Sequence, residues 1–158
     1  MKTLVVYDSF FGNTEKIAQA IGEGFGSGKS VQVVNVKNVA DSMLEALDFL
    51  IVGSPTRAFS PSPAIKSFVN NLNTEILRGV KVAAFDTRLP MGENVPGFLR
   101  FMVKLFGYAD KPMHDKLVKK GGQAAAEPMG FYVLESEGPL KDGEEARASA
   151  WAQEIKKG

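Results

Sequence analysis

Strand-length apolar runs recur along the first part of the chain. They are rich in valine, and most show no alternation of apolar and polar residues, which is typical of parallel strands buried on both faces. These runs are TLVVY (3–7), VQVVNV (31–36), FLIVGS (49–54) and KVAAFD (81–86). We expect a further strand from about Gln123 through GFYVL (130–134), bent at Glu127-Pro128.

Helical patterns fill the intervals between these runs. A first helix is marked by apolar positions spaced by three and four residues, namely Ile17, Ala18, Ile21 and Phe25. A second helix begins near Pro61 and Pro63, each preceded by serine, which is a helix start signal. Its apolar positions are Ile65, Phe68, Val69, Leu72 and Ile76.

The last helix is expected from about Glu144 to Lys156, with Trp151 and Ile155 facing the core. Strand and helix therefore alternate from end to end of the chain. This order predicts a doubly wound α/β sandwich, formed as one domain over residues 1–158.

The composition narrows the possible chemistry more than it narrows the possible folds. The 158 residues are 44% apolar, which is enough for a sizeable core. With 19 basic and 18 acidic residues, the net charge of +1 offers no field that would gather nucleic acid or an anionic membrane, so any partner must be recognised locally. The chain has no cysteine, which excludes disulfides, thiolate nucleophiles and iron–sulfur clusters. Redox chemistry would therefore need a bound cofactor.

The N-terminal run before Asp8 is too short for a signal peptide core or a membrane helix. We therefore expect a cytoplasmic protein. His114 is the only histidine, and no second metal ligand accompanies it in the sequence. We expect neither a metal site nor a catalytic side chain.

Three loops are candidates for a ligand site. In doubly wound sheets, ligands bind beyond the carboxyl ends of the strands, where the winding reverses direction. The loops at these ends are DSFFGNT (8–14), SPTRAFS (54–60) and DTRLPMG (86–92).

The first of these loops has the chemistry of an anion site. Ser9 and Thr14 supply hydroxyl groups, Gly12 allows a tight turn, and the following helix directs its free N–H groups at the loop. These features suit a phosphate. The alternative is that Ser9 or Asn13 only caps the helix. The sequence GSGKS (26–30) is no phosphate loop, since Glu23 replaces the first glycine and the segment follows a helix instead of a strand.

Several motifs together resemble the short-chain flavodoxin family. They are YDSFFGNTEKIA, GSPTRAFSPSP, FDTR and the C-terminal EPMGFYVLESEGPLKDGEEARASAWA. The resemblance covers nearly the whole chain. It implies a five-stranded parallel sheet of order 2-1-3-4-5, with helices on both faces, that binds flavin mononucleotide (FMN).

The resemblance also implies the cofactor contacts. Ser9, Gly12, Asn13 and Thr14 match the family's phosphate loop, in which Phe10 and Phe11 are also candidates for contact with the flavin. The positions that match the loops flanking the flavin ring are Pro55, Thr56, Arg57, Ala58, Phe59, Asp86, Thr87 and Arg88.

The implied function is electron transfer, with a redox partner protein or a small quinone as partner. Two alternatives stay open. GSPTR is also similar to the quinone reductases related to the tryptophan-repressor-binding protein, which suggests an FMN-dependent NAD(P)H:quinone oxidoreductase. Phe11 replaces a threonine found in many flavodoxins, and the ring loops hold no tyrosine or tryptophan. A flavin-free interaction module is therefore the second alternative.

Arg57 and Arg88 can act in two ways. A cation near the flavin ring would stabilise its anionic reduced form and raise the reduction potential. Alternatively, the arginines face solvent or pair with Asp86 and Glu93.

The segment VPGFLRFMVKLFGY (95–108) predicts a short apolar helix whose polar stripe is Arg100 and Lys104. We expect it to be a buried connection packed on the sheet. The alternative is a lid or a contact surface for a partner or an apolar quinone.

Overall fold

A parallel sheet forms the middle layer of the computed structural model, which describes residues 1–90 and 96–158. The strands follow the order β2-β1-β3-β4, and β5 and β6 share the fifth position beside β4. Every pairing is parallel, which confirms the predicted sheet. The strands are β1 (Thr3–Tyr7), β2 (Val31–Asn35), β3 (Phe49–Pro55), β4 (Lys81–Arg88), β5 (Gln123–Ala124) and β6 (Met129–Tyr132).

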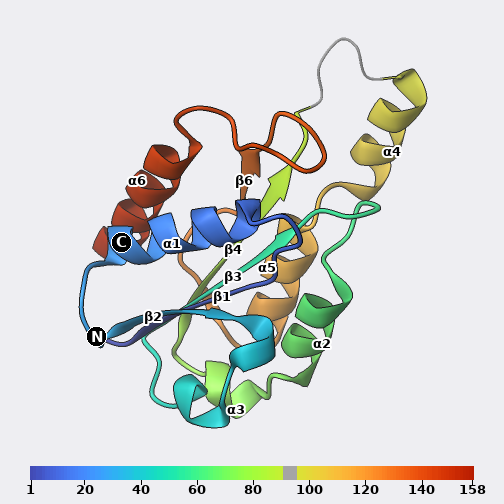
Figure 1. Cartoon of the computed structure of the whole chain (residues 1–158). Coiled ribbons are helices and arrows are strands. Elements are labelled where there is room, and N and C mark those ends of the chain that lie inside the picture. The colour runs from blue at the N-terminus through green and yellow to red at the C-terminus, as the bar shows by residue number, and fades with distance from the viewer. Residues whose placement is uncertain (91–95) are drawn as a thin grey trace.

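Helices cover both faces of the sheet (Figure 1). Two of them, α1 (Asn13–Phe25) and α6 (Glu144–Lys157), lie together on one face, and α2 (Pro63–Asn71) and α5 (Asp110–Lys119) lie together on the other. The remaining helices are α3 (Thr74–Leu77), α4 (Gly97–Phe106) and the 3₁₀ turns η1 (Val36–Asn38) and η2 (Asp41–Leu44). That all of this forms a single domain stays a prediction.

Burial of the sheet on both faces explains why its strands lack alternation. All residues of β1 are buried. Leu4 and Val6 belong to the core that α2 and α5 cover, whereas Val5 and Tyr7 belong to the core under α1 and α6. Since both faces of β1 meet apolar neighbours, every position of the strand favours an apolar side chain.

The core under α6 is aromatic. Trp151 on α6 meets the rings of Phe85 and Phe131 edge to face, with centroids 6.4 and 6.0 Å away. Trp151 and Ile155 are both buried, as the sequence predicted. Close packing of α6 on α1 depends on Gly24, because a Cβ there would lie 2.5 Å from the Ser149 carbonyl oxygen.

An ion pair on α6 covers the outer edge of β6. The Glu144 carboxylate accepts a hydrogen bond of 2.8 Å from Tyr132 N–H, and Arg147 Nη2 donates to the Gly130 carbonyl at 2.6 Å. Arg147 also donates to Glu144 at 2.6 Å. The pair therefore satisfies backbone groups of β6 that face away from β4.

The second predicted helix is interrupted, which corrects the sequence analysis. It ends at Asn71, and a separate turn, α3, begins after Asn73, whose side chain accepts a hydrogen bond from Ile76 N–H. The apolar spacing continues across this break because Leu72 is buried even though it is not helical. Lys120 donates its ammonium group to the carbonyl oxygens of Asn70 and Leu72, so it also stabilises the end of α2.

The fifth strand is divided at the predicted bend. β5 ends at Ala124 and β6 starts at Met129, so Glu127 and Pro128 lie between two short strands that both pair with β4.

The predicted burial of segment 95–108 is wrong. Val95 lies outside the described residues, and no residue of α4 is buried. Figure 1 shows α4 standing away from the helices that cover the sheet. Within residues 1–90 and 96–158, no helix combines the length and apolar character needed to cross a membrane.

Gly53 tests how closely the sheet packs. A Cβ at Gly53 would lie 2.0 Å from the ring of Phe85, the residue that pairs with Gly53 on the neighbouring strand β4. We expect Gly53→Ala to lower the free energy of unfolding by about 2 kcal/mol, because the Phe85 ring must move. Urea unfolding measures this loss. Gly97→Ala is the control, because a Cβ at Gly97 meets nothing within 4 Å. Equal stability of both variants would contradict the packing argument.

Candidate functional site

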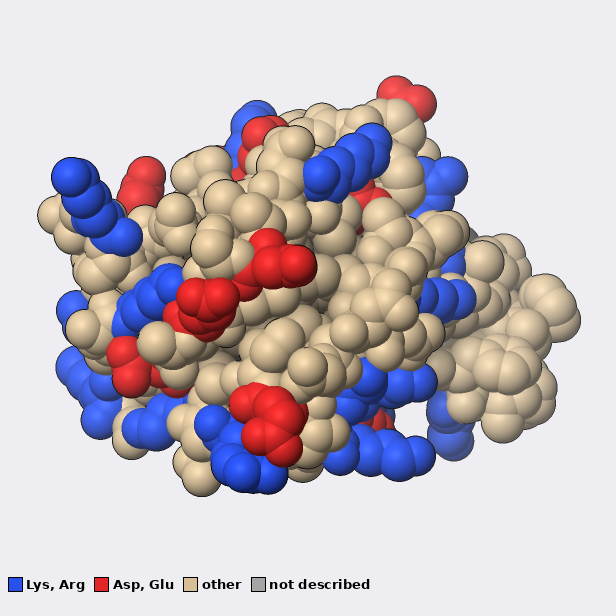
Figure 2. Space-filling model, turned by 90° about the horizontal axis from the view of Figure 1, so that it is seen from below, with Lys and Arg blue, Asp and Glu red and all other residues tan. Residues whose placement is uncertain are grey.

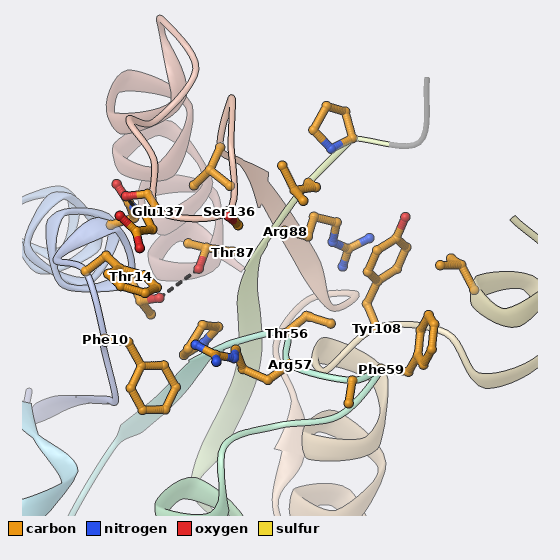
Figure 3. Close-up of a pocket in the computed structure, with 18 of the residues that line it drawn as sticks. Phe10, Thr14, Thr56, Arg57, Phe59, Thr87, Arg88, Tyr108, Ser136 and Glu137 are labelled. Atoms are coloured by element: carbon orange, nitrogen blue, oxygen red, sulfur yellow. Dashed lines mark hydrogen bonds between the residues drawn. The ribbon is translucent and has the colours of Figure 1, made fainter. Parts of the chain in front are cut away.

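Three loops meet at the carboxyl edge of the sheet and enclose a cavity of about 710 Å³. Figure 3 shows their side chains converging on this space. Most of the predicted site residues line it: Ser9, Phe10, Phe11, Asn13, Thr14, Pro55, Thr56, Arg57, Ala58, Phe59, Thr87 and Arg88. Gly12 and Asp86 are not among the lining residues, although both belong to the same loops.

The first loop gathers backbone N–H groups onto one oxygen. Ser9 Oγ accepts hydrogen bonds from Gly12 N–H at 3.1 Å and from Glu15 N–H at 3.4 Å. Gly12 is the N-cap residue of α1 and has a φ of 92°, a left-handed conformation that favours glycine. Because glycine lacks a side chain, Gly12 cannot itself cap the helix with a side-chain hydrogen bond. The Ser9 hydroxyl oxygen therefore caps the first turn of α1, which is the alternative that the sequence left open for this residue.

Asn13 and Thr14 fix the loop to its neighbours. Asn13 Nδ2 donates to the Glu137 carbonyl at 3.0 Å, so its side chain joins α1 to the segment after β6 instead of capping the helix. The Thr14 and Thr87 hydroxyl groups are hydrogen-bonded at 2.7 Å (Figure 3). Both threonines are buried and lie on the cavity wall.

The second loop presents side chains from an unusual backbone. Ala58 and Phe59 have φ values of 48° and 66°, which are uncommon for residues with a Cβ. Paired backbone hydrogen bonds of 3.0 Å between Arg57 and Ser60 close the turn. Strain of this kind is common at ligand sites.

The two arginines have different surroundings. Arg57 is exposed and lies over the Phe10 ring, with its Cζ 4.9 Å from the ring centroid. Arg88 is held by two carboxylates, Asp86 at 2.7 Å and Asp110 at 2.8 Å. Of the expected carboxylate partners, Asp86 therefore pairs with Arg88, while Glu93 lies outside the described residues. The second loop thus contributes an exposed cation, Arg57, whereas the cation of the third loop, Arg88, is paired with two carboxylates.

Asp86 lies behind the residues that line the cavity and holds them in place. Its carboxylate is fully buried and accepts hydrogen bonds from Arg88, from Thr56 Oγ1 at 3.1 Å and from Asp110 N–H at 3.0 Å. These donors come from the end of β4, the loop after β3 and the start of α5. Asp86 therefore sets the relative positions of three segments.

Burial raises the pKa of Asp86 to about 6, although the Arg88 guanidinium acts in the opposite direction. The desolvation cost of the buried carboxylate is thus larger than the stabilisation from its cationic neighbour.

The cavity has an aromatic residue that sequence reasoning missed. Tyr108 lines it, and Arg88 lies over the Tyr108 ring with Cζ 3.6 Å from the centroid (Figure 3). Burial raises the pKa of the Tyr108 phenol. Tyr108 ends the apolar segment 95–108, so only the placement of that segment beside the cavity could have revealed it.

Two further groups of lining residues were missed. Leu89 and Pro90 continue the third loop beyond Arg88, and the others come from the segment around α4 and from the turn after β6. These residues are Leu89, Pro90, Pro96, Leu99, Val103, Val133, Ser136 and Glu137.

Comparison with known proteins identifies the family. A family model described as a flavodoxin domain matches residues 4–119. The chain belongs to the flavodoxin family. It is therefore an electron-transfer protein of the flavodoxin type. A search of curated proteins finds no match to this flavodoxin-family chain.

Solved structures show the same fold. Oxidised flavodoxin 1 from Bacillus cereus is 19% identical with a TM-score of 0.73, and the match covers 99% of this chain and 98% of that one. An archaeal flavodoxin is 21% identical with a TM-score of 0.75, covering 99% and 97%. Rubredoxin oxygen:oxidoreductase from Desulfovibrio gigas is 19% identical with a TM-score of 0.74, but the match covers 99% of this chain and only 35% of that one.

The pKa of Asp86 is measurable by following its carboxyl carbon resonance in NMR, assigned with Asp86→Asn. We expect titration near 6, well above the ordinary value of 3.8. Arg88→Gln should raise this pKa further, because the lowering influence of the guanidinium is lost.

The sign for stability follows from that shift. Since the pKa of Asp86 is higher in the folded protein, its stabilising contribution is complete below pH 3.8 and is lost as the pH rises to about 6. The change amounts to roughly 3 kcal/mol in the free energy of unfolding of this flavodoxin-family chain. A wild-type Asp86 that titrates near its ordinary value would contradict this assignment.

Proposed function

We propose that the cavity binds FMN and that the protein carries single electrons or electron pairs between protein partners. The observation that supports this most directly is that the three loops predicted from the sequence meet at the carboxyl edge of the sheet and line one cavity of about 710 Å³. FMN, when bound, would supply the oxidation and reduction, because the chain has no cysteine that could do so.

The first loop fits the phosphate end. Gly12 N–H and Glu15 N–H already share one oxygen acceptor, and a phosphate oxygen offers the same chemistry with a full charge. The Thr14 and Ser9 hydroxyl groups add donors on the cavity side. Phe11 removes one hydroxyl relative to many flavodoxins, but one neutral hydrogen bond contributes only about 1 kcal/mol.

The other two loops fit the ring end. Phe59 and Tyr108 provide aromatic surface, and Thr56 is held in place by Asp86. The volume of about 710 Å³ lies within the usual range for cofactor sites. Tyr108, which follows α4, also supports flavin binding, because it places a tyrosine beside the cavity although the ring loops themselves hold none. These residues would bind and orient the ring and exclude water from it.

Visible absorption after incubation with FMN and desalting tests the cofactor. We expect retained flavin bands in the wild type. Ser9→Ala and Thr14→Ala should each raise the dissociation constant by roughly tenfold or more, because each removes a hydrogen bond to a charged phosphate.

Ser67→Ala on the exposed surface of α2 is the matched control and should leave FMN affinity unchanged. Circular dichroism checks that all variants stay folded. A colourless wild type whose unfolding temperature does not respond to FMN would overturn the proposal and favour the flavin-free interaction module.

The carrier function is preferred over that of a quinone oxidoreductase. Length does not separate the two functions, because the alignment covers 97% or more of two flavodoxins and 95% of a WrbA-like protein. The preference rests on the family model that matches residues 4–119, which is described as a flavodoxin domain. We expect slow reduction of the FMN-loaded protein by NADPH alone and rapid reduction once a flavoprotein reductase is added. Stopped-flow absorbance measures both rates. Rapid, multiple-turnover oxidation of NADPH with a soluble quinone and no added protein would instead assign the enzyme activity.

A further inference from the structure

We propose that Thr87 is a positioning residue for Thr14: the Thr87 hydroxyl donates its proton to Thr14 Oγ1, so that Thr14 presents its own hydroxyl proton to a phosphate oxygen in the cavity. Thr14 lies in the first turn of α1, and Thr87 lies near the end of β4. This inference rests on the proposed function and deepens it. It assigns Thr87, which the family resemblance placed beside the flavin ring, to the phosphate end of the cavity.

The start of α1 has hydrogen-bond donors without acceptors. Glu15 N–H is bound to Ser9 Oγ. In the part of the chain that the structure describes, the N–H groups of Asn13 and Thr14, which are the first two of the helix, have no acceptor. Both residues are buried and line the cavity. An acceptor for these two donors therefore comes from the contents of the cavity, as it does at helix starts that bind anions.

The hydroxyl groups of Thr14 and Thr87 also have a proton to spare. Their mutual hydrogen bond of 2.7 Å is the only one that either hydroxyl makes within residues 1–90 and 96–158 (Figure 3). Each hydroxyl carries one proton, and the shared bond uses one of the two. Thr14 is 1% exposed and Thr87 is 5% exposed, so the second proton depends on an acceptor in the cavity that both residues line.

A bound anion would decide which hydroxyl donates, because the geometry allows either direction. An oxygen that accepts from Thr14 N–H lies close to Thr14 Oγ1, since both groups belong to one residue. If Thr14 donated to Thr87, lone pairs of Thr14 Oγ1 would face the anion and repel it. With Thr87 as the donor, Thr14 offers the anion a proton instead, and a hydrogen bond to a charged oxygen is stronger than one between neutral groups.

The backbone holds Thr87 firmly in this position. Thr87 pairs with Pro55 on β3 and with Phe131 on β6. Its carbonyl oxygen accepts a hydrogen bond of 3.0 Å from Thr56 N–H, and its branched side chain has few rotamers. A donor fixed between two neighbouring strands is suited to orienting the hydroxyl of a residue at the start of a helix.

The charges of the chain offer no general positive field for an anion. The net charge is only +1, and Figure 2 shows lysine and arginine side chains beside aspartate and glutamate on the face seen from below. Among the described residues that line the cavity, the charged ones are Arg57, Arg88 and Glu137. Arg88 is already paired with two carboxylates, and Arg57 lies over Phe10. We therefore expect phosphate affinity to depend on the N–H and hydroxyl donors at the start of α1.

Fluorescence titration with FMN and with riboflavin, which has the same ring but no phosphate, tests the proposal. We expect Thr14→Val to raise the dissociation constant of FMN by roughly tenfold or more, and Thr87→Val to raise it by about fivefold. The double variant should bind FMN no more weakly than Thr14→Val alone, because Thr87 acts through Thr14. All three variants should bind riboflavin within about twofold of the wild type, since the ring contacts are unchanged.

Two further variants serve as controls. Thr87→Ser keeps the hydroxyl and should retain the FMN affinity of the wild type. Thr3→Val removes a buried hydroxyl that has no hydrogen-bond partner among the described residues and that lies at the start of β1, away from the carboxyl edge of the sheet. It should leave FMN affinity unchanged. Circular dichroism should show every variant folded, because valine has nearly the shape of threonine.

Two patterns of FMN affinity would refute the positioning role. If Thr87→Val weakens FMN and riboflavin equally, or if the losses of the two single variants multiply in the double variant, Thr87 contacts the ligand itself. If Thr87→Val binds FMN as weakly as the double variant while Thr14→Val binds it better, the hydrogen bond runs from Thr14 to Thr87.

A wild type that does not bind FMN contradicts the proposed function, and inorganic phosphate then tests the inference alone. Phosphate should raise the unfolding temperature of the flavin-free wild type and of Thr87→Ser more than that of Thr87→Val, because it binds the folded protein through Thr14. Equal shifts in the three proteins, or no shift in the wild type, would refute the inference as well.

Discussion

The buried carboxylate of Asp86 is the interaction on which the shape of the cavity depends. It lies at the end of β4 and receives donors from the loop after β3 and from the start of α5. Arg88 binds both Asp86 and Asp110, so β4 and α5 are joined by ionic contacts as well. Burying a carboxylate costs more than this pairing returns, as the raised pKa of Asp86 indicates. The arrangement therefore serves the geometry of the loops more than the stability of the fold.

Local features of the site could be read from the sequence. The turn around Gly12 and the hydroxyl groups beside it lie within six residues, between a strand and a helix whose patterns are both clear. Since the carboxyl ends of parallel strands share one edge, the other two loops followed from the order of elements. Tyr108 and Glu137 could not be found in this way, because their positions depend on how distant segments fold back to the cavity.

Two predictions about helices show where periodicity stops being informative. The spacing that predicted one helix through Ile76 persists across Leu72, since a buried residue is apolar whether or not it is helical. The apolar pattern of α4 predicted burial, because periodicity reports which side chains avoid water and not what covers them. In the part of the chain that the structure describes, no residue of α4 is buried.

The ion pair of Glu144 and Arg147 has a consequence for aggregation. An edge strand with free backbone groups is a template onto which another chain can add a strand. On β6 the Tyr132 N–H and the Gly130 carbonyl are occupied by these two side chains, and the Tyr132 carbonyl accepts from Lys141 N–H at 2.9 Å. Pro128, just before β6, offers no N–H at all. Side chains of α6 and the backbone of Lys141 thus occupy the backbone groups of β6 with which an added strand would pair.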